Sequence, residues 1–268
     1  MKRTALLGFM LGLVVAAGFA QVDIRNISSV GVDANFQGPA GIDVNQVVLF
    51  DVTDWLNGEV KLQRQDTAVL HETTISVAPI FIVSSYNYII VRYGLGIGTG
   101  AEASNTVETN ADGRSFSHDL AIDANHETAS VYANLAVRGS YYPDDDYFFV
   151  LPTVAARFSL GSRWSVLGRY FFSYNSEQAI SNAVLGEASY QLTDRFQIKA
   201  GASGALDLVR TPWMADDAPR DTEWEVTGIT GFAFRVRPTL ALRWHFEYLG
   251  RLGQADGIRN ILVLDATF

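Results

Sequence analysis

An alternation of apolar and polar residues recurs along the chain from residue 21 onward, in a series of short segments. In the segment VGVDANF, for example, Val30, Val32 and Ala34 alternate with Gly31 and Asp33. Because successive side chains of a β-strand point to opposite faces, this spacing gives each segment one apolar and one polar face. Helical periodicity is almost absent after residue 20. The pattern therefore predicts an all-β protein made of many short strands.

Two kinds of connection alternate between these segments. Short ones, such as LTDRF (192–196), are followed by polar and often longer ones, such as 101–113 and 210–221. Short turns at one rim and long loops at the other are typical of a transmembrane antiparallel up-and-down β-barrel. We expect about fourteen strands, with twelve as the alternative if the third strand and the turn near His126 fail. The expected strands are 27–37, 42–52, 58–66, 72–83, 87–100, 114–124, 128–141, 147–159, 164–175, 180–192, 195–209, 222–236, 239–250 and 258–268.

The composition of the two faces indicates which one meets lipid. The polar face is mostly Gly, Ser, Ala and Asn with isolated charges, whereas a soluble sandwich or barrel would expose Lys, Glu and Thr. The apolar face carries aromatic residues near the strand ends, as membrane barrels do at both interfaces. They are Trp55, Tyr88, Phe158, Trp164, Tyr190, Phe196 and Phe234 beside short turns, and Phe36, Tyr141, Phe148, Tyr174, Trp224 and Tyr248 beside long loops. We therefore expect an apolar exterior and a polar lumen, with a soluble all-β protein as the alternative.

The N-terminal residues and the composition bear on targeting, on disulfide bonds and on nucleic acid as a partner. Residues 1–20 combine Lys2 and Arg3, an apolar stretch and small residues at 18 and 20, so we expect a signal peptide followed by a barrel over 21–268. The chain has no cysteine, so its stability must come from burial and backbone pairing. The formal net charge of −9 and the lack of a basic tract argue against nucleic acid as a partner.

The final segment, NILVLDATF, places Leu262, Leu264 and Phe268 on one face of a strand. With the expected signal peptide and the alternating strands, it resembles the last strand of Gram-negative outer-membrane β-barrels. The resemblance implies location in the outer membrane, contact with outer-membrane lipid and lipopolysaccharide, and recognition of Phe268 by the barrel-assembly machinery. Ile261 and Val263 depart from the usual pattern, because they make the lumen face of this strand unusually apolar. The nearest functional type is the monomeric, fourteen-stranded general porin.

Charged residues on the polar face are candidates for the lining of a pore. The tentative lining set is Arg92, Arg138, Arg157, Arg169, Lys199, Arg243, Asp33, Asp43, Glu187 and Glu247. Acids dominate the first strands and bases dominate from the fifth strand onward, which predicts facing walls of opposite sign and a field across the lumen. The alternative for each residue is that it pairs with a neighbour and only holds the barrel open. The set favours a monomeric pore for the passive diffusion of small polar or charged solutes.

Two other functions remain open from the sequence. One is a barrel enzyme acting on lipid, of the phospholipase or lipid A modification type, for which SFSHD (115–119) offers Ser117 and His118. Neighbouring residues of a strand face opposite sides, so these two are poorly placed to act together. The other is a non-conducting surface anchor or adhesin. We find no pattern for a metal site or cofactor, and interpret GLGIGTG (94–100) as a lumen-facing strand rather than a phosphate loop.

Overall fold

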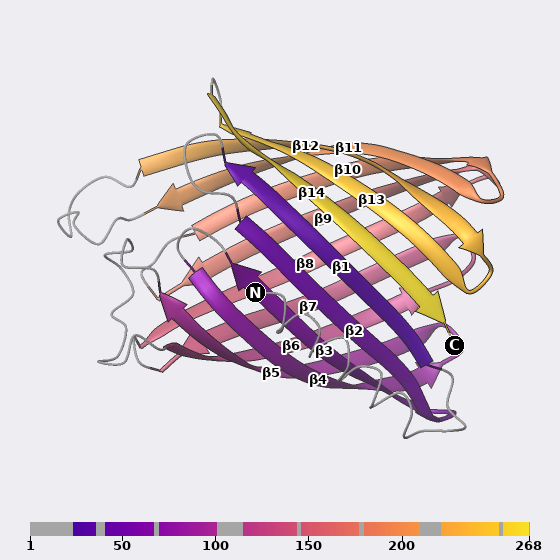
Figure 1. Ribbon diagram of the computed structural model, residues 1–268, viewed down its shortest axis with the longest axis horizontal. Helices are drawn as coiled ribbons and strands as arrows, with labels where there is room; N and C mark the ends of the chain where they lie inside the picture. The colour runs from indigo at the N-terminus through magenta and orange to yellow at the C-terminus, as the bar shows by residue number, and fades with distance from the viewer. Residues whose placement is uncertain are drawn as a thin grey trace.

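The computed structural model describes residues 24–35, 41–66, 70–100, 115–143, 146–176, 180–209, 221–251 and 254–267. They form fourteen antiparallel strands, each paired with the next, and β1 pairs with β14 to close a barrel (Figure 1). The strands are β1 (Ile24–Asn35), β2 (Gly41–Thr53), β3 (Leu56–Asp66), β4 (Leu70–Ser84), β5 (Asn87–Gly100), β6 (Ser115–Glu127), β7 (Val131–Tyr142), β8 (Tyr147–Leu160), β9 (Trp164–Asn175), β10 (Ile180–Thr193), β11 (Phe196–Val209), β12 (Asp221–Arg237), β13 (Leu240–Arg251) and β14 (Gln254–Thr267). The predicted all-β fold with fourteen strands is confirmed, and the twelve-strand alternative is wrong.

Among the described residues, no helix is long and apolar enough to cross a membrane.

The two uncertain elements of the prediction both exist, with small shifts in their ends. The third strand is β3, and the sixth continues to Glu127, so its turn falls at 128–130 rather than at 125–127. The Thr128 hydroxyl closes this turn, accepting a hydrogen bond from the Val131 amide at 3.0 Å. The first strand starts at Ile24 rather than at residue 27. The backbone of Arg25 pairs with that of Thr267, and this pairing does not require Arg25 to have an apolar side chain.

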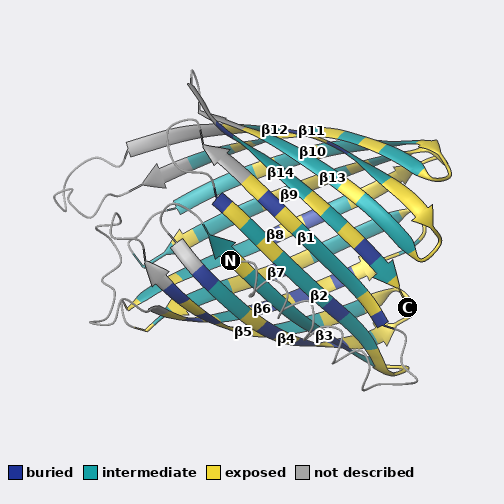
Figure 2. Cartoon of the chain, in the orientation of Figure 1, coloured by how far each residue is buried: buried dark blue, intermediate teal, exposed yellow. Residues whose placement is uncertain are grey.

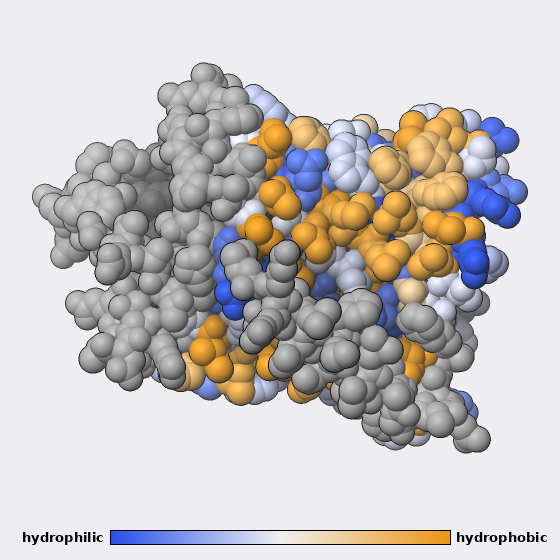
Figure 3. Space-filling view, in the orientation of Figure 1, coloured by the Kyte–Doolittle hydropathy of each residue, from blue (hydrophilic) through white to orange (hydrophobic). Residues whose placement is uncertain are grey.

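Apolar side chains cover the outside of the barrel, and small or polar ones face inward. Leu120 on β6 is 53% exposed, whereas its neighbour Ala121 is 6% exposed. Figure 2 shows this alternation of exposed and buried residues along strand after strand, and Figure 3 shows apolar side chains gathered on the surface of the wall. A soluble barrel would bury these apolar stripes in its centre, so the structure supports the membrane arrangement predicted from the two faces.

Aromatic side chains near the short turns mostly follow the prediction. Trp164 and Tyr190 pack together on the outer face with ring centroids 4.7 Å apart. Tyr88 is wrongly assigned to the outer face, because it pairs in register with Ile82 and Asn125 and so shares the inward face with Arg92. The predicted belt positions Phe36 and Trp224 lie outside the residues whose side chains the structure describes.

Two prolines interrupt the backbone ladder within the wall. Pairing of β4 with β5 skips the positions beside Pro79, and pairing of β8 with β9 skips those beside Pro152. Proline has no backbone N–H to donate, so one ladder bond is missing at each site.

Close packing between strands fixes the identity of one inward glycine. A Cβ atom on Gly231 of β12 would overlap the carbonyl oxygen of Trp244 on β13 and would lie 3.1 Å from Cε of Lys199. The carbonyl belongs to the paired backbone and cannot move away without breaking the ladder. Gly168 is different, because a Cβ there would meet nothing within 4 Å.

We predict that Gly231→Ala lowers the free energy of unfolding by about 1–3 kcal/mol, the usual cost of overpacking. Gly168→Ala is the matched control and should leave stability unchanged or slightly raised. Urea unfolding of the refolded barrel, followed by tryptophan fluorescence, measures both. Equal stability of the two variants would show that the β12–β13 backbones are not held at this spacing.

Candidate functional site

Arg92 lies at the centre of a charge cluster on the inward face. Its guanidinium is 2.8 Å from Glu59 Oε1 on β3 and 3.6 Å from Asp123 Oδ2 on β6. Arg138 of β7 approaches the same Asp123 at 3.5 Å. The contact with Glu59 crosses the whole width of β4, where the small inward residue Ala78 leaves room for it. Four strands are therefore tied together inside the lumen.

A second contact crosses β5 at its glycines. The Ser117 hydroxyl on β6 donates to Glu72 Oε1 on β4 at 2.7 Å, and both side chains are buried. A Cβ atom on Gly96 would overlap both polar groups, so only glycine leaves space for this bond. The structure thus confirms that 94–100 is a strand, with its glycines facing the lumen.

The strands that close the barrel carry a third cluster. Arg25 of β1 holds Asp265 of β14 with two hydrogen bonds, Nε to Oδ1 at 2.9 Å and Nη2 to Oδ2 at 2.6 Å. Arg243 of β13 donates to the same carboxylate from the other side. Two cations therefore share one carboxylate across the closing seam. Sequence reasoning missed Arg25, because the first strand was expected to begin after it.

The other predicted lining residues take part in smaller contacts. Lys199 lies 3.0 Å from Glu187, and Arg157 lies 3.6 Å from Glu127. Glu247 contacts His245 at 2.7 Å and Arg259 at 3.8 Å. At these positions acids and bases of the same strand, of neighbouring strands or of strands two apart lie next to one another within the wall.

Nine of the ten predicted lining residues share the inward face with these clusters. The guanidinium of Arg169 lies over the ring of Phe171, 5.6 Å from its centroid. Asp43 packs beside Gly31: the Cβ of Asp43 lies 3.6 Å from the position that a Cβ added to Gly31 would occupy. The side chain of Asp33, and Phe268 as a whole, lie outside the described residues.

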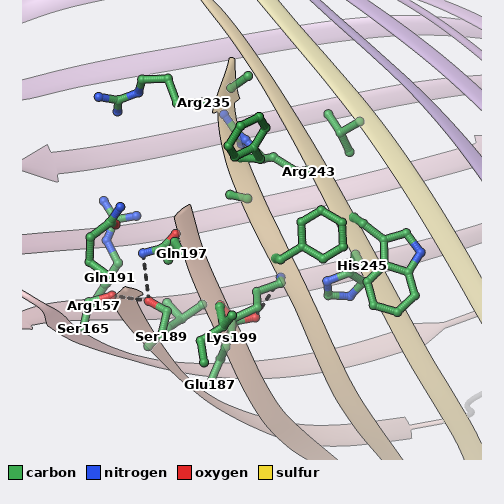
Figure 4. A pocket seen from close by; sticks show the side chains of 18 of the residues that line it. Arg157, Ser165, Glu187, Ser189, Gln191, Gln197, Lys199, Arg235, Arg243 and His245 are labelled. Carbon is green, nitrogen blue, oxygen red and sulfur yellow. Dashed lines mark hydrogen bonds and ion pairs between the residues drawn. The ribbon is translucent and has the colours of Figure 1, made fainter. Parts of the chain in front are cut away.

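Two cavities lie in the lumen among the residues that the structure describes. The larger, of about 710 Å³, lies at the end of the barrel with the tight turns, which we call the short-turn end. It is lined from β7 round to β14, and Figure 4 shows Arg157, Gln191, Lys199, Arg235 and Arg243 projecting from the strands around it. The smaller, of about 260 Å³, lies beside the Arg92 cluster. The described residues hold no group of three or more side chains suited to bind a metal ion.

Ser117 and His118 point to opposite sides of β6. Ser117 is buried in the lumen, whereas His118 bonds through Nδ1 to the Tyr93 hydroxyl, at 2.9 Å, on the outer face. The sequence prediction that the two residues face opposite sides of the strand agrees with this geometry.

A closed barrel of fourteen strands, apolar outside and charged inside, defines the chain as an outer-membrane β-barrel protein. The fold agrees with the predicted location in the cell outer membrane. No protein-family model and no curated protein sequence matches the chain.

Several solved structures have the same fold at very low sequence identity. The CymD monoaromatic hydrocarbon channel has a TM-score of 0.60 at 7% identity, over 92% of this chain and 88% of that one. An outer-membrane channel from Pseudomonas putida F1 has a TM-score of 0.57 at 10% identity, over 92% and 95%. The toluene transporter TodX of Pseudomonas putida has a TM-score of 0.55 at 8% identity, over 92% and 88%. At these identities the similarity establishes the fold.

We predict that Asp265→Asn lowers the free energy of unfolding by about 2 kcal/mol, because charge-assisted bonds are lost and two arginines remain close together. The control is Asp66→Asn, which removes a carboxylate from the exposed Arg64–Asp66 pair on the outer face. That change should cost no more than about 1 kcal/mol. Urea unfolding compares the two, and equal losses would contradict a special role for the closing seam.

Proposed function

We propose that the protein is a monomeric outer-membrane pore for the passive diffusion of small polar or charged solutes, and not an enzyme. The observation that carries the proposal is the charged inward face, which surrounds cavities of about 710 and 260 Å³. A lumen lined by ionised groups stays hydrated, and a hydrated lumen conducts ions unless something blocks it.

The names of the structural neighbours support a channel rather than a catalyst. Three of them are described as a hydrocarbon channel, an outer-membrane channel and a toluene transporter. The charged clusters around Arg92 and Asp265 favour polar solutes over hydrocarbons in this chain, since an apolar molecule gains nothing from passing them. The separation of Ser117 from His118 leaves the lipid-modifying alternative without a nucleophile–base pair at that place.

We further propose that the outward face contacts lipid and lipopolysaccharide, and that Phe268 serves as the signal for barrel assembly. The exposed Arg64–Asp66 pair lies on the outer face at the end opposite the tight turns, where a charged lipid headgroup could reach it.

Planar-bilayer recording on the refolded protein tests the pore. We expect discrete current steps after insertion, with a reversal potential in a salt gradient that is set by the lumen charges. Insertion is verified separately by the heat-dependent gel mobility of the folded barrel. Verified insertion without current, and without solute flux in vesicle-swelling assays, would refute the pore and favour the anchor.

We predict that the double variant Arg92→Glu with Arg138→Glu shifts selectivity towards cations. Both arginines contact Asp123, so their reversal leaves an acidic cluster with Glu59 in the lumen. The milder Arg138→Gln should shift the reversal potential in the same direction by less, and it guards against misfolding of the double variant. Arg64→Glu, on the outer face, should leave the reversal potential unchanged; a shift as large as that of the lumen variants would contradict the assigned faces.

A further inference from the structure

The cavity at the short-turn end is cationic although the chain as a whole is acidic. Six cationic side chains line this cavity against two carboxylates, Glu187 and Asp194, while the formal net charge of the chain is −9. The excess of positive charge is therefore a local property of this part of the lumen. Enclosed walls of low dielectric strengthen such a field and raise the local concentration of anions.

Two of these cations are available to a ligand. Among the residues that the structure describes, no carboxylate forms an ion pair with Arg169 or Arg235. The Nε atom of Arg169 is buried and has no hydrogen-bond partner there. A buried donor without an acceptor costs free energy, and a ligand that accepts from it recovers that cost.

A third cation, Arg157, is held only weakly. It lies 3.6 Å from Glu127, and the two side chains are 48% and 51% exposed. An ion pair with this exposure contributes little. Its guanidinium also lies over the ring of Tyr132, 5.4 Å from the centroid, and both residues line the cavity.

The same cavity has an apolar wall. Ile261 and Val263 of β14 line it, and they pair in register with His245 and Arg243 on β13. Leu167 of β9 adds a further apolar side chain. A pore that passed only hydrated ions would gain nothing from this wall, because apolar side chains do not replace a hydration shell. The wall does suit a solute that carries an apolar body beside its charge.

We infer that this cavity is a binding site for small organic carboxylates with an apolar body. Arg169 or Arg235 holds the carboxylate, and Ile261 and Val263 contact the apolar body. The planar fork of arginine matches the two oxygens of a carboxylate. The volume of about 710 Å³ lies within the range found for sites that take small organic molecules. The inference deepens the proposed function by naming the solute class, and rests on that function only for the step of transport.

Calorimetric titration of the refolded barrel in detergent tests the site with four probes. They are benzoate, benzyl alcohol, benzylammonium and inorganic phosphate, which separate the charge, its sign and the apolar body. We expect benzoate to bind about tenfold or more tightly than benzyl alcohol and benzylammonium, and more tightly than phosphate. Benzoate that bound no better than benzyl alcohol would overturn the inference.

Two double variants assign the contacts. Arg169→Gln with Arg235→Gln should weaken benzoate binding about tenfold or more, and among the described carboxylates none loses an ion pair. Ile261→Ser with Val263→Ser should weaken benzoate and leave phosphate unchanged. Arg64→Gln, outside the barrel, is the control for charge removal. Unchanged benzoate affinity in the arginine variant, with folding verified by gel mobility, would overturn the site, and an equal loss of benzoate and phosphate in the serine variant would overturn the role of the apolar wall.

Bilayer recordings separate this inference from the proposed function. Benzoate should reduce the single-channel current at concentrations at which benzylammonium has no effect on that current. Benzoate binding without any conductance would leave the site standing and refute the pore. Conductance that does not discriminate benzoate from benzylammonium, together with no benzoate binding, would leave the pore standing and refute the site.

Discussion

Closure of the sheet is the constraint on which this structure depends. Lipid offers no hydrogen-bond partner, so every strand edge must pair with another strand. The edges that close the sheet belong to β1 and β14, whose pairing runs from Arg25 with Thr267 to Asn35 with Gly257. The Arg25–Asp265 bond joins residues 240 positions apart in the sequence. A charged contact is thus placed where the chain must bring its two ends together, and the second arginine, Arg243, extends it to β13.

The inward face owes its connectivity to its small residues. A glycine or alanine on one strand lets side chains from the strands on either side reach over it, as at Gly96 and Ala78. Large residues there would confine each charge to its immediate neighbours. The outer face needs no such contacts across a strand, because its exposed apolar side chains carry no polar group that requires a partner. A shift of pairing by one residue would exchange the faces and drive charges into lipid, so the two faces together fix the register.

The sequence was sufficient for the strands and their faces, because both follow from the alternation of neighbouring residues. It was insufficient where the outcome depended on the strand after next, and the local pattern was misread at two further positions. The Arg92–Glu59 contact needs the stagger of β3, β4 and β5, which no local pattern encodes. Tyr88 was predicted to be an interface aromatic because it lies near a turn, but the alternation along β5 places its side chain on the inward face. Arg25 was lost because polar residues at the start of β1 do not look like a strand.

The final strand combines two tasks that explain its unusual composition. It must pair with both β1 and β13, and its inward residues must also furnish part of the lumen wall. Asp265 meets the first need by holding one arginine on each side. Ile261 and Val263, four and two residues earlier on the same face, do not contribute charge to the closure. In a lumen lined by so many ionised groups, hydration alone does not explain two apolar side chains at these positions. Both residues line the cationic cavity, where they can contact the apolar body of an anion. A charge beside an apolar surface binds anions of different apolar bodies with different affinity, whereas a charge alone does not distinguish them.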